Sequence, residues 1–313
     1  MRAVRVHRYG GPEVMVVEDA PRPEAGAGEL LVRVMAAGVN PVDWKTRKGQ
    51  GAAKRWEGDR FPLILGWDVS GVVEAVGPGV EDFGPGDEVF GLVRFPEPGG
   101  CYAQFTAVPS AQVVAKPAVL DHAHAAALPL VALTAWQALF DTARLEATET
   151  VLVHAAAGGV GHVAVQLAKG KGARVVGTAS AANHDLVRSL GADHVVDYST
   201  TRFEDEVGSV DVVVDPVGGD TLDRSFAVLA RGGRLVSLVA DPDADRARQR
   251  EVEATRILVH PDAAQLAQVA DLVESGLLLP VVGAQMSLAD AAGAHELGET
   301  GHSRGKIVLV VGE

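Results

Sequence analysis

Three glycines near the middle of the chain have the spacing of a nucleotide-binding turn. Gly158, Gly159 and Gly161 stand in "HAAAGGVGHVA", directly after the apolar run "VLV" and at the start of a segment with helical periodicity. Glycine in such a turn lets backbone N–H groups approach a pyrophosphate, which then lies at the positive end of the following helix. The pattern predicts a dinucleotide site. The alternative is a turn whose glycines only allow tight packing of a strand against a helix.

The same turn departs from the usual pattern at one position. Ala156 stands where the first glycine is expected, and its methyl group predicts a slightly wider turn. The middle glycine makes the closest approach to the phosphate, so the departure is compatible with binding. We therefore include Ala156, Ala157 and Val160 in the predicted cofactor site.

The end of the next strand bears on the choice of cofactor. A site for NAD has Asp or Glu about 20 residues beyond the glycines, where the carboxylate accepts from the ribose hydroxyls. This strand ends in Thr178, followed by Ala179 and Ser180, with His184 close behind as a possible donor. Hydroxyl groups accommodate a 2′-phosphate that a carboxylate would repel. The sequence favours NADPH, although hydroxyls can also bind NAD.

The elements that must position this turn change character along the chain. Up to about residue 117, short alternating apolar runs are separated by Gly and Pro, which is typical of antiparallel strands. From residue 150 onward, strands and helices alternate, which predicts an α/β fold with a doubly wound parallel sheet. With 313 residues, of which 47% are hydrophobic, the chain is long enough for two domains.

Composition excludes several function classes. The net charge of −13 argues against a nucleic-acid partner or an anionic membrane surface. No apolar run is long enough for a transmembrane helix, and the first residues lack the apolar core of a signal peptide. The single cysteine, Cys101, fits a reducing compartment. We therefore expect a cytoplasmic protein.

Motifs in a fixed order give the chain a resemblance to a known family. They include "AAGVNPVDWKTRKG", "LGWDVSGVVEAVGPGV", "GDEVFGL", "AALPLVALTAWQAL", "HAAAGGVGHVAVQLAK", "LGADHVVDY" and "RGKIVL". The chain resembles the medium-chain dehydrogenase/reductase superfamily, in its zinc-free quinone oxidoreductase-like branch. The resemblance implies a GroES-like catalytic domain from residues 1–121 and 261–313. It also implies a Rossmann NADP-binding domain over residues 122–260, an active site between the domains, and a homodimer.

The resemblance also shows which metal ligands are missing. Asn40, Trp67 and Leu130 stand where zinc-dependent relatives have their three ligands, and none of them replaces a Cys/His/Cys set. His122 and His124 have no evident third ligand. We expect no zinc site.

Without a metal, the acceptor must already be electrophilic, as quinones and α,β-unsaturated carbonyls are. The oxygen that gains negative charge then needs hydrogen-bond donors. We assign this role to Asn40 and Lys45 and expect the ammonium to be the stronger donor. Lys45 can equally be a solvated surface group. Trp44 and Trp67 are candidates for the substrate cleft, although Trp44 can also be a packing residue and Trp67 can also fill the volume of the absent metal site. The resemblance implies that Thr134 touches the nicotinamide.

Other residues complete the predicted cofactor site. The resemblance places Tyr198 near the adenosine end of the cofactor, and Val217, Leu238 and Val239 stand at or just after two later strands. Asp43 and Asp68 are expected to orient their loops. The function predicted is an NADPH-dependent reductase of quinones or enones. A non-catalytic NADPH-binding protein and an alcohol dehydrogenase-like enzyme remain as alternatives.

Overall fold

The computed structural model describes residues 1–58 and 60–312, which form two compact units. The first unit consists of residues 1–133, 260–276 and 280–313, and the second of residues 134–259 and 277–279. The sequence places the first boundary earlier, at residue 121. The structure moves it because helix α2 (His122–Ala126) packs Ala123 and Ala126 against Ala36 and Val308 of the first unit.

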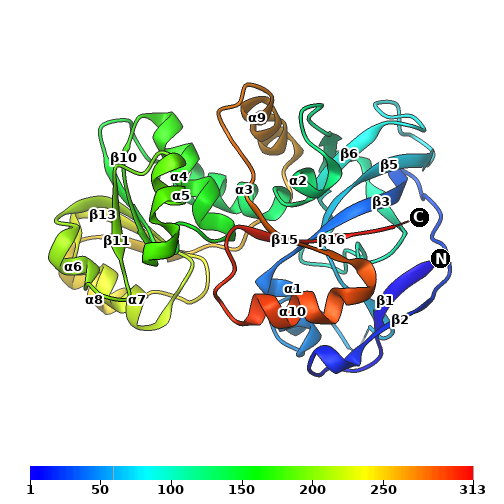
Figure 1. Cartoon of the computed structure of the whole chain (residues 1–313), viewed down its shortest axis with the longest axis horizontal. Helices are drawn as coiled ribbons and strands as arrows, with labels where there is room; N and C mark the ends of the chain where they lie inside the picture. The colour runs from blue at the N-terminus through cyan, green and yellow to red at the C-terminus, as the bar shows by residue number, and fades with distance from the viewer. Residues whose placement is uncertain (59, 313) are drawn as a thin grey trace. The chain divides into compact units, whose positions relative to one another are not determined.

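A parallel sheet forms the centre of the second unit (Figure 1). Among the described residues it has six strands, in the order β11-β10-β9-β12-β13-β14, and every neighbouring pair is parallel. The near-continuous runs of valine and leucine in β9 and β12 suit strands that are covered on both faces. The strand order reverses between β9 and β12, which is where doubly wound sheets bind ligands. The strands are β9 (Thr150–Val153), β10 (Arg174–Ala179), β11 (His194–Asp197), β12 (Val210–Asp215), β13 (Leu229–Ser237) and β14 (Glu253–Arg256).

Short helices connect these strands, and the longest of them follows the glycine turn. Helix α4 begins at Gly159 and ends before Gly172, whose φ of 96° is a left-handed helix terminus that glycine adopts readily. The helices of this unit are α4 (Gly159–Lys171), α5 (His184–Ser189), α6 (Phe203–Glu206), α7 (Gly219–Ser225) and α8 (Ala244–Arg250). A single-turn segment at Ala181–Asn183 precedes α5.

The first unit is built mainly from antiparallel strands. One sheet has the order β15-β16-β3-β5-β6-β8, with β7 also paired to β3, and a smaller sheet has the order β2-β1-β4. The C-terminal strand β16 therefore pairs with β3 from the N-terminal part of the chain. The strands are β1 (Arg2–Val6), β2 (Met15–Asp19), β3 (Glu29–Val39), β4 (Leu63–Ile64), β5 (Asp68–Val76), β6 (Glu88–Leu92), β7 (Phe105–Pro109), β8 (Val113–Ala115), β15 (Val282–Ser287) and β16 (Lys306–Val310).

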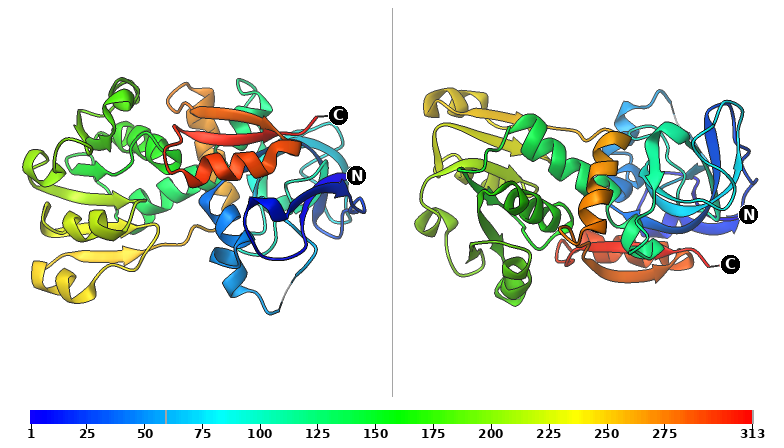
Figure 2. Two further views of the ribbon diagram at one scale, coloured as in Figure 1. Left: turned by 60° about the horizontal axis from the view of Figure 1, so that its bottom comes forward. Right: turned by 90° about the horizontal axis from the view of Figure 1, so that it is seen from above.

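Two helices of the first unit bear on the site. Helix α1 (Pro41–Arg47) follows β3 directly, and α10 (Ala291–Glu299) packs against α1, β15 and β16 (Figure 2). Helix α9 (Ala263–Glu274) packs on β8, and α3 (Pro129–Trp136) crosses the boundary between the units. Further short turns of this unit lie at Pro12–Val14, Gly51–Arg55, Ser110–Gln112 and Leu288–Asp290. In the second unit, a π-helix at Gln137–Thr142 follows α3. Within the described residues, no helix is long and apolar enough to cross a membrane.

Candidate active site

The glycine turn of the second unit leaves no room for a side chain at Gly161. A Cβ atom there would lie 2.2 Å from the carbonyl oxygen of Ala155 and 2.8 Å from Cα of Ala156. Both are backbone atoms, so no side-chain rotation can relieve the contact. Ala155 itself has a φ of 47°, in the left-handed region. The turn therefore closes tightly on the start of α4, where the first N–H groups of a helix have no partner within it and attract an anion.

The structure explains how this turn accommodates Ala156. The side chain of Ala156 is buried against β10, where a Cβ atom on Gly177 would lie 2.8 Å from the Ala156 methyl group. Gly177 thus provides the space that the methyl group occupies. The backbone N–H of Ala156 also donates to the carbonyl oxygen of Thr178 over 2.9 Å, which holds the turn against the neighbouring strand.

Thr178 belongs to this internal support. Its side chain is only 4% exposed, and its hydroxyl accepts from the N–H of Ala155 over 3.2 Å. The same hydroxyl lies 3.2 Å from Nδ1 of His154, whose Nε2 lies 3.0 Å from the hydroxyl of Ser225. Burial lowers the pKa of His154 to about 3, so its ring is neutral. The structure therefore corrects the assignment of Thr178 to a 2′-phosphate, since its hydroxyl is already engaged inside the unit.

Other polar groups remain at the end of β10. Ser180 is half-buried and accepts from the side-chain amide of Asn183 over 3.2 Å, and His184 lies just beyond. Asp197 ends the adjacent strand, in register with Ala179. Hydrogen bonds from the side chain and backbone of Ser199 hold the pKa of Asp197 below its usual value. The strand end thus carries hydroxyl, amide and imidazole groups beside one charged carboxylate.

Two buried side chains hold the remaining predicted cofactor loops. Asp215, at the end of β12, accepts from the N–H groups of Val217 and Gly218 over 2.9 to 3.1 Å. Ser237, its partner in register on β13, accepts more weakly from the N–H of Val239 over 3.4 Å. The sequence predicted Val217, Leu238 and Val239 as cofactor contacts, but the two side chains that hold their loops were not identified. A polar residue that ends an apolar strand run is the signal that identifies them.

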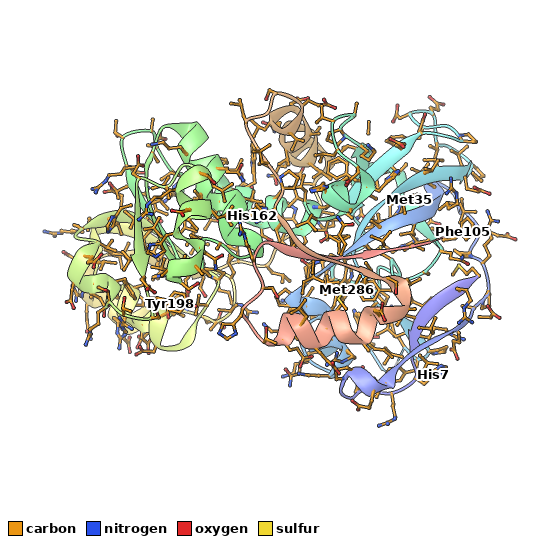
Figure 3. All side chains as sticks on the ribbon, in the orientation of Figure 1. His7, Met35, Phe105, His162, Tyr198 and Met286 are labelled. Carbon is orange, nitrogen blue, oxygen red and sulfur yellow. The ribbon has the colours of Figure 1, made fainter. Side chains whose placement is uncertain are left out.

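The last two predicted cofactor contacts lie in different environments. Tyr198 is 55% exposed at the surface of the second unit (Figure 3). Thr134 is buried on α3.

In the first unit, the three positions of the absent metal ligands gather around Asp68. The side-chain amide of Asn40 donates to Asp68 Oδ2 over 2.8 Å, and the backbone N–H of Leu130 donates to Oδ1 over 2.8 Å. Trp67 is the preceding residue on the chain. Burial raises the pKa of Asp68, and the nearby Lys306 opposes that shift.

A buried lysine, which sequence reasoning missed, supplies the positive charge of this cluster. Lys306 is 2% exposed, and its Nζ donates to the carbonyl oxygen of Val39 over 2.7 Å and to Oδ1 of Asn40. Nζ lies 3.6 Å from Oδ2 of Asp68. Burial lowers the pKa of Lys306, and the Asp68 and Asp43 carboxylates oppose that shift. The signal for this lysine in the sequence was a cation at the first position of an apolar strand, "KIVLV".

This cluster gives Asn40 a role different from the one predicted. Asn40 is fully buried, its amide group is engaged at both ends, and its backbone N–H donates to Asp43 Oδ2 over 2.7 Å. Asn40 is the residue before α1, so these contacts fix the start of that helix. We therefore assign Asn40 to positioning α1 and leave Lys45 as the proposed donor to the acceptor.

Asp43 extends the same polar cluster, as its predicted orienting role requires. It accepts from the N–H of Gly66 over 3.1 Å, and burial raises its pKa to about 7. Tyr102 also hydrogen-bonds Asp43, and its hydroxyl lies 3.3 Å from Nε2 of His295 on α10. Nδ1 of His295 accepts from Arg47 over 2.9 Å. This chain of contacts fixes α1 against α10.

Ion pairs fix the C-terminal end of α1 against α10. The buried guanidinium of Arg47 and the ammonium of Lys48 both pair with Glu299, the latter over 2.6 Å. Lys45 lies on the exposed face of this fixed helix. A cation on a rigid helix is better preorganised than one on a loop.

The two tryptophans proposed for the substrate cleft take part in packing. Trp67 is 1% exposed, donates its indole N–H to the carbonyl oxygen of Glu97 over 2.6 Å and packs edge-on against Phe95. This agrees with the alternative that Trp67 fills the metal volume. Trp44 packs on α10, where a Cβ on Gly298 would lie 2.7 Å from its ring.

The residues present do not fit a zinc ion. Zinc needs lone pairs from N, S or O ligands. The Asn40 amide oxygen accepts from Lys306, Leu130 has an apolar side chain, and the indole of Trp67 is only a donor. Over the described residues, no group of three or more His, Cys, Asp or Glu side chains is arranged to hold a metal.

Comparisons with known proteins place the chain among oxidoreductases. The model of the alcohol dehydrogenase GroES-like domain matches residues 26–118, and that of the zinc-binding dehydrogenase matches residues 190–309. The quinone oxidoreductase of Rattus norvegicus is 34% identical, over 98% of this chain and 96% of the rat protein. The chloroplastic NADPH-dependent alkenal/one oxidoreductase of Arabidopsis thaliana is 35% identical, over 99% of this chain and 79% of the plant protein.

Solved structures give the same result. The quinone oxidoreductase from Coxiella burnetii is 37% identical and superposes with a TM-score of 0.94, over 100% of this chain and 99% of that chain. A mycobacterial protein solved in complex with NADPH is 33% identical, with a TM-score of 0.89, over 99% of this chain and 100% of that chain. The similarity thus extends over both units.

Proposed function

Because the chain belongs to the quinone oxidoreductase-like branch of the medium-chain dehydrogenase/reductase superfamily, we propose that it transfers hydride from NADPH to a quinone or an α,β-unsaturated carbonyl without a metal ion. One observation supports the proposal that the reaction needs no metal ion. An ion pair of Lys306 and Asp68 lies at the three positions of the zinc ligands, beside Asn40 and Leu130. An enzyme without a Lewis acid requires an acceptor that is already electrophilic.

We assign roles in this reaction to residues of the chain. A bound nicotinamide would supply the hydride, with its electron pair, for the β-carbon of an enone or for a quinone. The π electrons move to the carbonyl oxygen, and a proton from water completes the product. Lys45 stabilises the oxygen while it is negatively charged. At the tight turn around Gly161, the N–H groups at the start of α4 would hold the pyrophosphate of the cofactor.

NADPH is the cofactor we propose, and Ser180 and His184 are the groups we assign to its 2′-phosphate. Both follow β10, and that strand ends without a carboxylate of its own. The nearby Asp197 is charged, and His184 is close enough to contribute to its lowered pKa.

Ser180→Asp is expected to reverse the cofactor preference. Wild type should bind NADPH more tightly than NADH, and the new carboxylate should weaken NADPH by about 10- to 100-fold, because it would face the 2′-phosphate. Ser180→Asn is the matched neutral control and should keep the wild-type order. Fluorescence titration of the three proteins with both cofactors measures the six affinities. Equal wild-type affinity for NADPH and NADH would contradict this assignment.

An NADPH-oxidation screen tests the proposed function. Quinones, alkenals, enones and simple ketones should be compared with and without a chelator, and the zinc content of the purified protein measured. We expect turnover of quinones or enones, none of simple ketones, and no loss in chelator. Zinc whose removal abolishes turnover would instead support an alcohol dehydrogenase-like enzyme. Cofactor binding without any turnover would support a non-catalytic role.

The assembly and the location stay predictions from the sequence. We propose a homodimer, which sedimentation analysis can test, and a cytoplasmic location, which a tagged protein in its own cell can test. The Arabidopsis relative is named as chloroplastic, so location differs among relatives of this chain.

A further inference from the structure

The segment around α1 is basic in a chain that is otherwise acidic. The whole chain has 28 Lys and Arg residues against 41 Asp and Glu residues. Between residues 45 and 60 this balance is reversed, because the segment contains Lys45, Arg47, Lys48, Lys54, Arg55 and Arg60. A local positive field on a negative protein attracts anions selectively to that place.

Half of these cations have partners within the protein. Glu299 pairs with Arg47 and Lys48, and Glu97 pairs with Arg60 over 3.0 Å. Lys45, Lys54 and Arg55 are exposed, and over residues 1–58 and 60–312 no ion pair involves any of them. We call these three residues the cation group.

The turn that carries Lys54 and Arg55 is fixed against Lys45. The N–H of Gln50 donates to the carbonyl oxygen of Lys45 over 2.8 Å, and a Cβ on Gly51 would lie 3.2 Å from the Lys45 Cβ. Ala52, Ala53 and Trp56 of the same turn are buried. The indole N–H of Trp56 donates to the carbonyl oxygen of Pro96 over 2.9 Å. The buried residues anchor the turn, and the two cations between them face outward.

We propose that the cation group selects an acceptor that carries an anionic group, such as a carboxylate, beside its reducible carbonyl. This inference rests on the proposed function, in which Lys45 contacts the acceptor oxygen. Lys54 and Arg55 add two positive charges next to that contact. Arginine and lysine without internal partners contribute little to stability and are free to pair with a carboxylate of the substrate.

A matched pair of substrates tests the proposal. The 4-oxo-5-hexenoate anion and its methyl ester share one reducible enone, which two methylene groups separate from the carboxylate or ester, so the two compounds differ mainly in charge. With NADPH, wild type should show the higher kcat/KM for the acid, and added salt should reduce that advantage. The double variant Lys54→Glu, Arg55→Glu should lower kcat/KM for the acid by about 10- to 100-fold and leave the ester within about twofold.

A control variant separates local from global charge effects. Lys171→Glu, Arg250→Glu makes the same change in net charge at two exposed positions of the second unit. We expect this control variant to leave kcat/KM unchanged for both the acid and the ester. An equal loss for acid and ester in the Lys54 and Arg55 variant would overturn the proposal. So would a weakened NADPH affinity, since the cations would then hold cofactor phosphates.

The same assay distinguishes failure of this inference from failure of the proposed function. If wild type reduces the ester but shows no preference for the acid, the anionic acceptor is wrong and the reductase stands. If wild type reduces neither compound and no quinone, the proposed function fails, and this inference fails with it.

Discussion

Gly161→Ala is expected to weaken NADPH binding by at least about 100-fold, which corresponds to about 2.7 kcal/mol. The added Cβ would lie 2.2 Å from the carbonyl oxygen of Ala155. The turn must therefore open, and the N–H groups at the start of α4 move away from the pyrophosphate position. Fluorescence titration of NADPH measures the loss. Circular dichroism and thermal unfolding check that the variant is folded.

Gly170→Ala provides the matched control for this variant. Gly170 lies in the same helix, and a Cβ there would meet no atom within 4 Å. We expect unchanged NADPH affinity and a gain in stability of up to about 1 kcal/mol, because alanine favours the helix over glycine. If Gly161→Ala bound NADPH as wild type does, the turn would not be the phosphate site.

Lys45→Met is expected to lower kcat/KM for an enone by roughly 10- to 1,000-fold, with little change in NADPH affinity. The ammonium would act on the oxygen that gains charge during hydride transfer, so its loss affects mainly the transition state. A strongly electrophilic quinone should lose less, because its reduced oxygen needs less help. Steady-state kinetics with one enone and one quinone give the ratio of the two losses.

Lys48→Met is the control for Lys45. Lys48 lies one turn further along, just after α1, and pairs with Glu299, so its substitution removes a cation without touching the proposed donor. We expect wild-type kinetics from it. If Lys45→Met reduced enones at the wild-type rate, Lys45 would be a surface charge and not the donor to the acceptor.

Asn40→Ala is expected to lower the stability of the protein, since it removes a partner from both Lys306 and Asp68.

Local patterns explain why some parts of the site could be predicted. The glycine spacing and the strand before it identify the turn at residues 154–161, because the residues that mark a turn of this kind are close together in the sequence. The alternation of apolar strands and helices predicts the parallel sheet for the same reason. The replaced ligand positions at Asn40, Trp67 and Leu130 can also be identified without coordinates, since residue type alone shows that they do not form a Cys/His/Cys set.

The sequence by itself thus determined the fold class, the family and the position of the glycine turn that we propose as the phosphate site. Only the tertiary structure decided which polar groups are already engaged. Thr178 and Asn40 present suitable chemistry, but one supports the turn from β10 and the other joins Asp68 and Lys306. Lys306 is 266 residues from Asn40 in the chain, and their contact forms because β16 pairs with β3. No local pattern encodes such a pairing, since it depends on how distant strands align in one sheet.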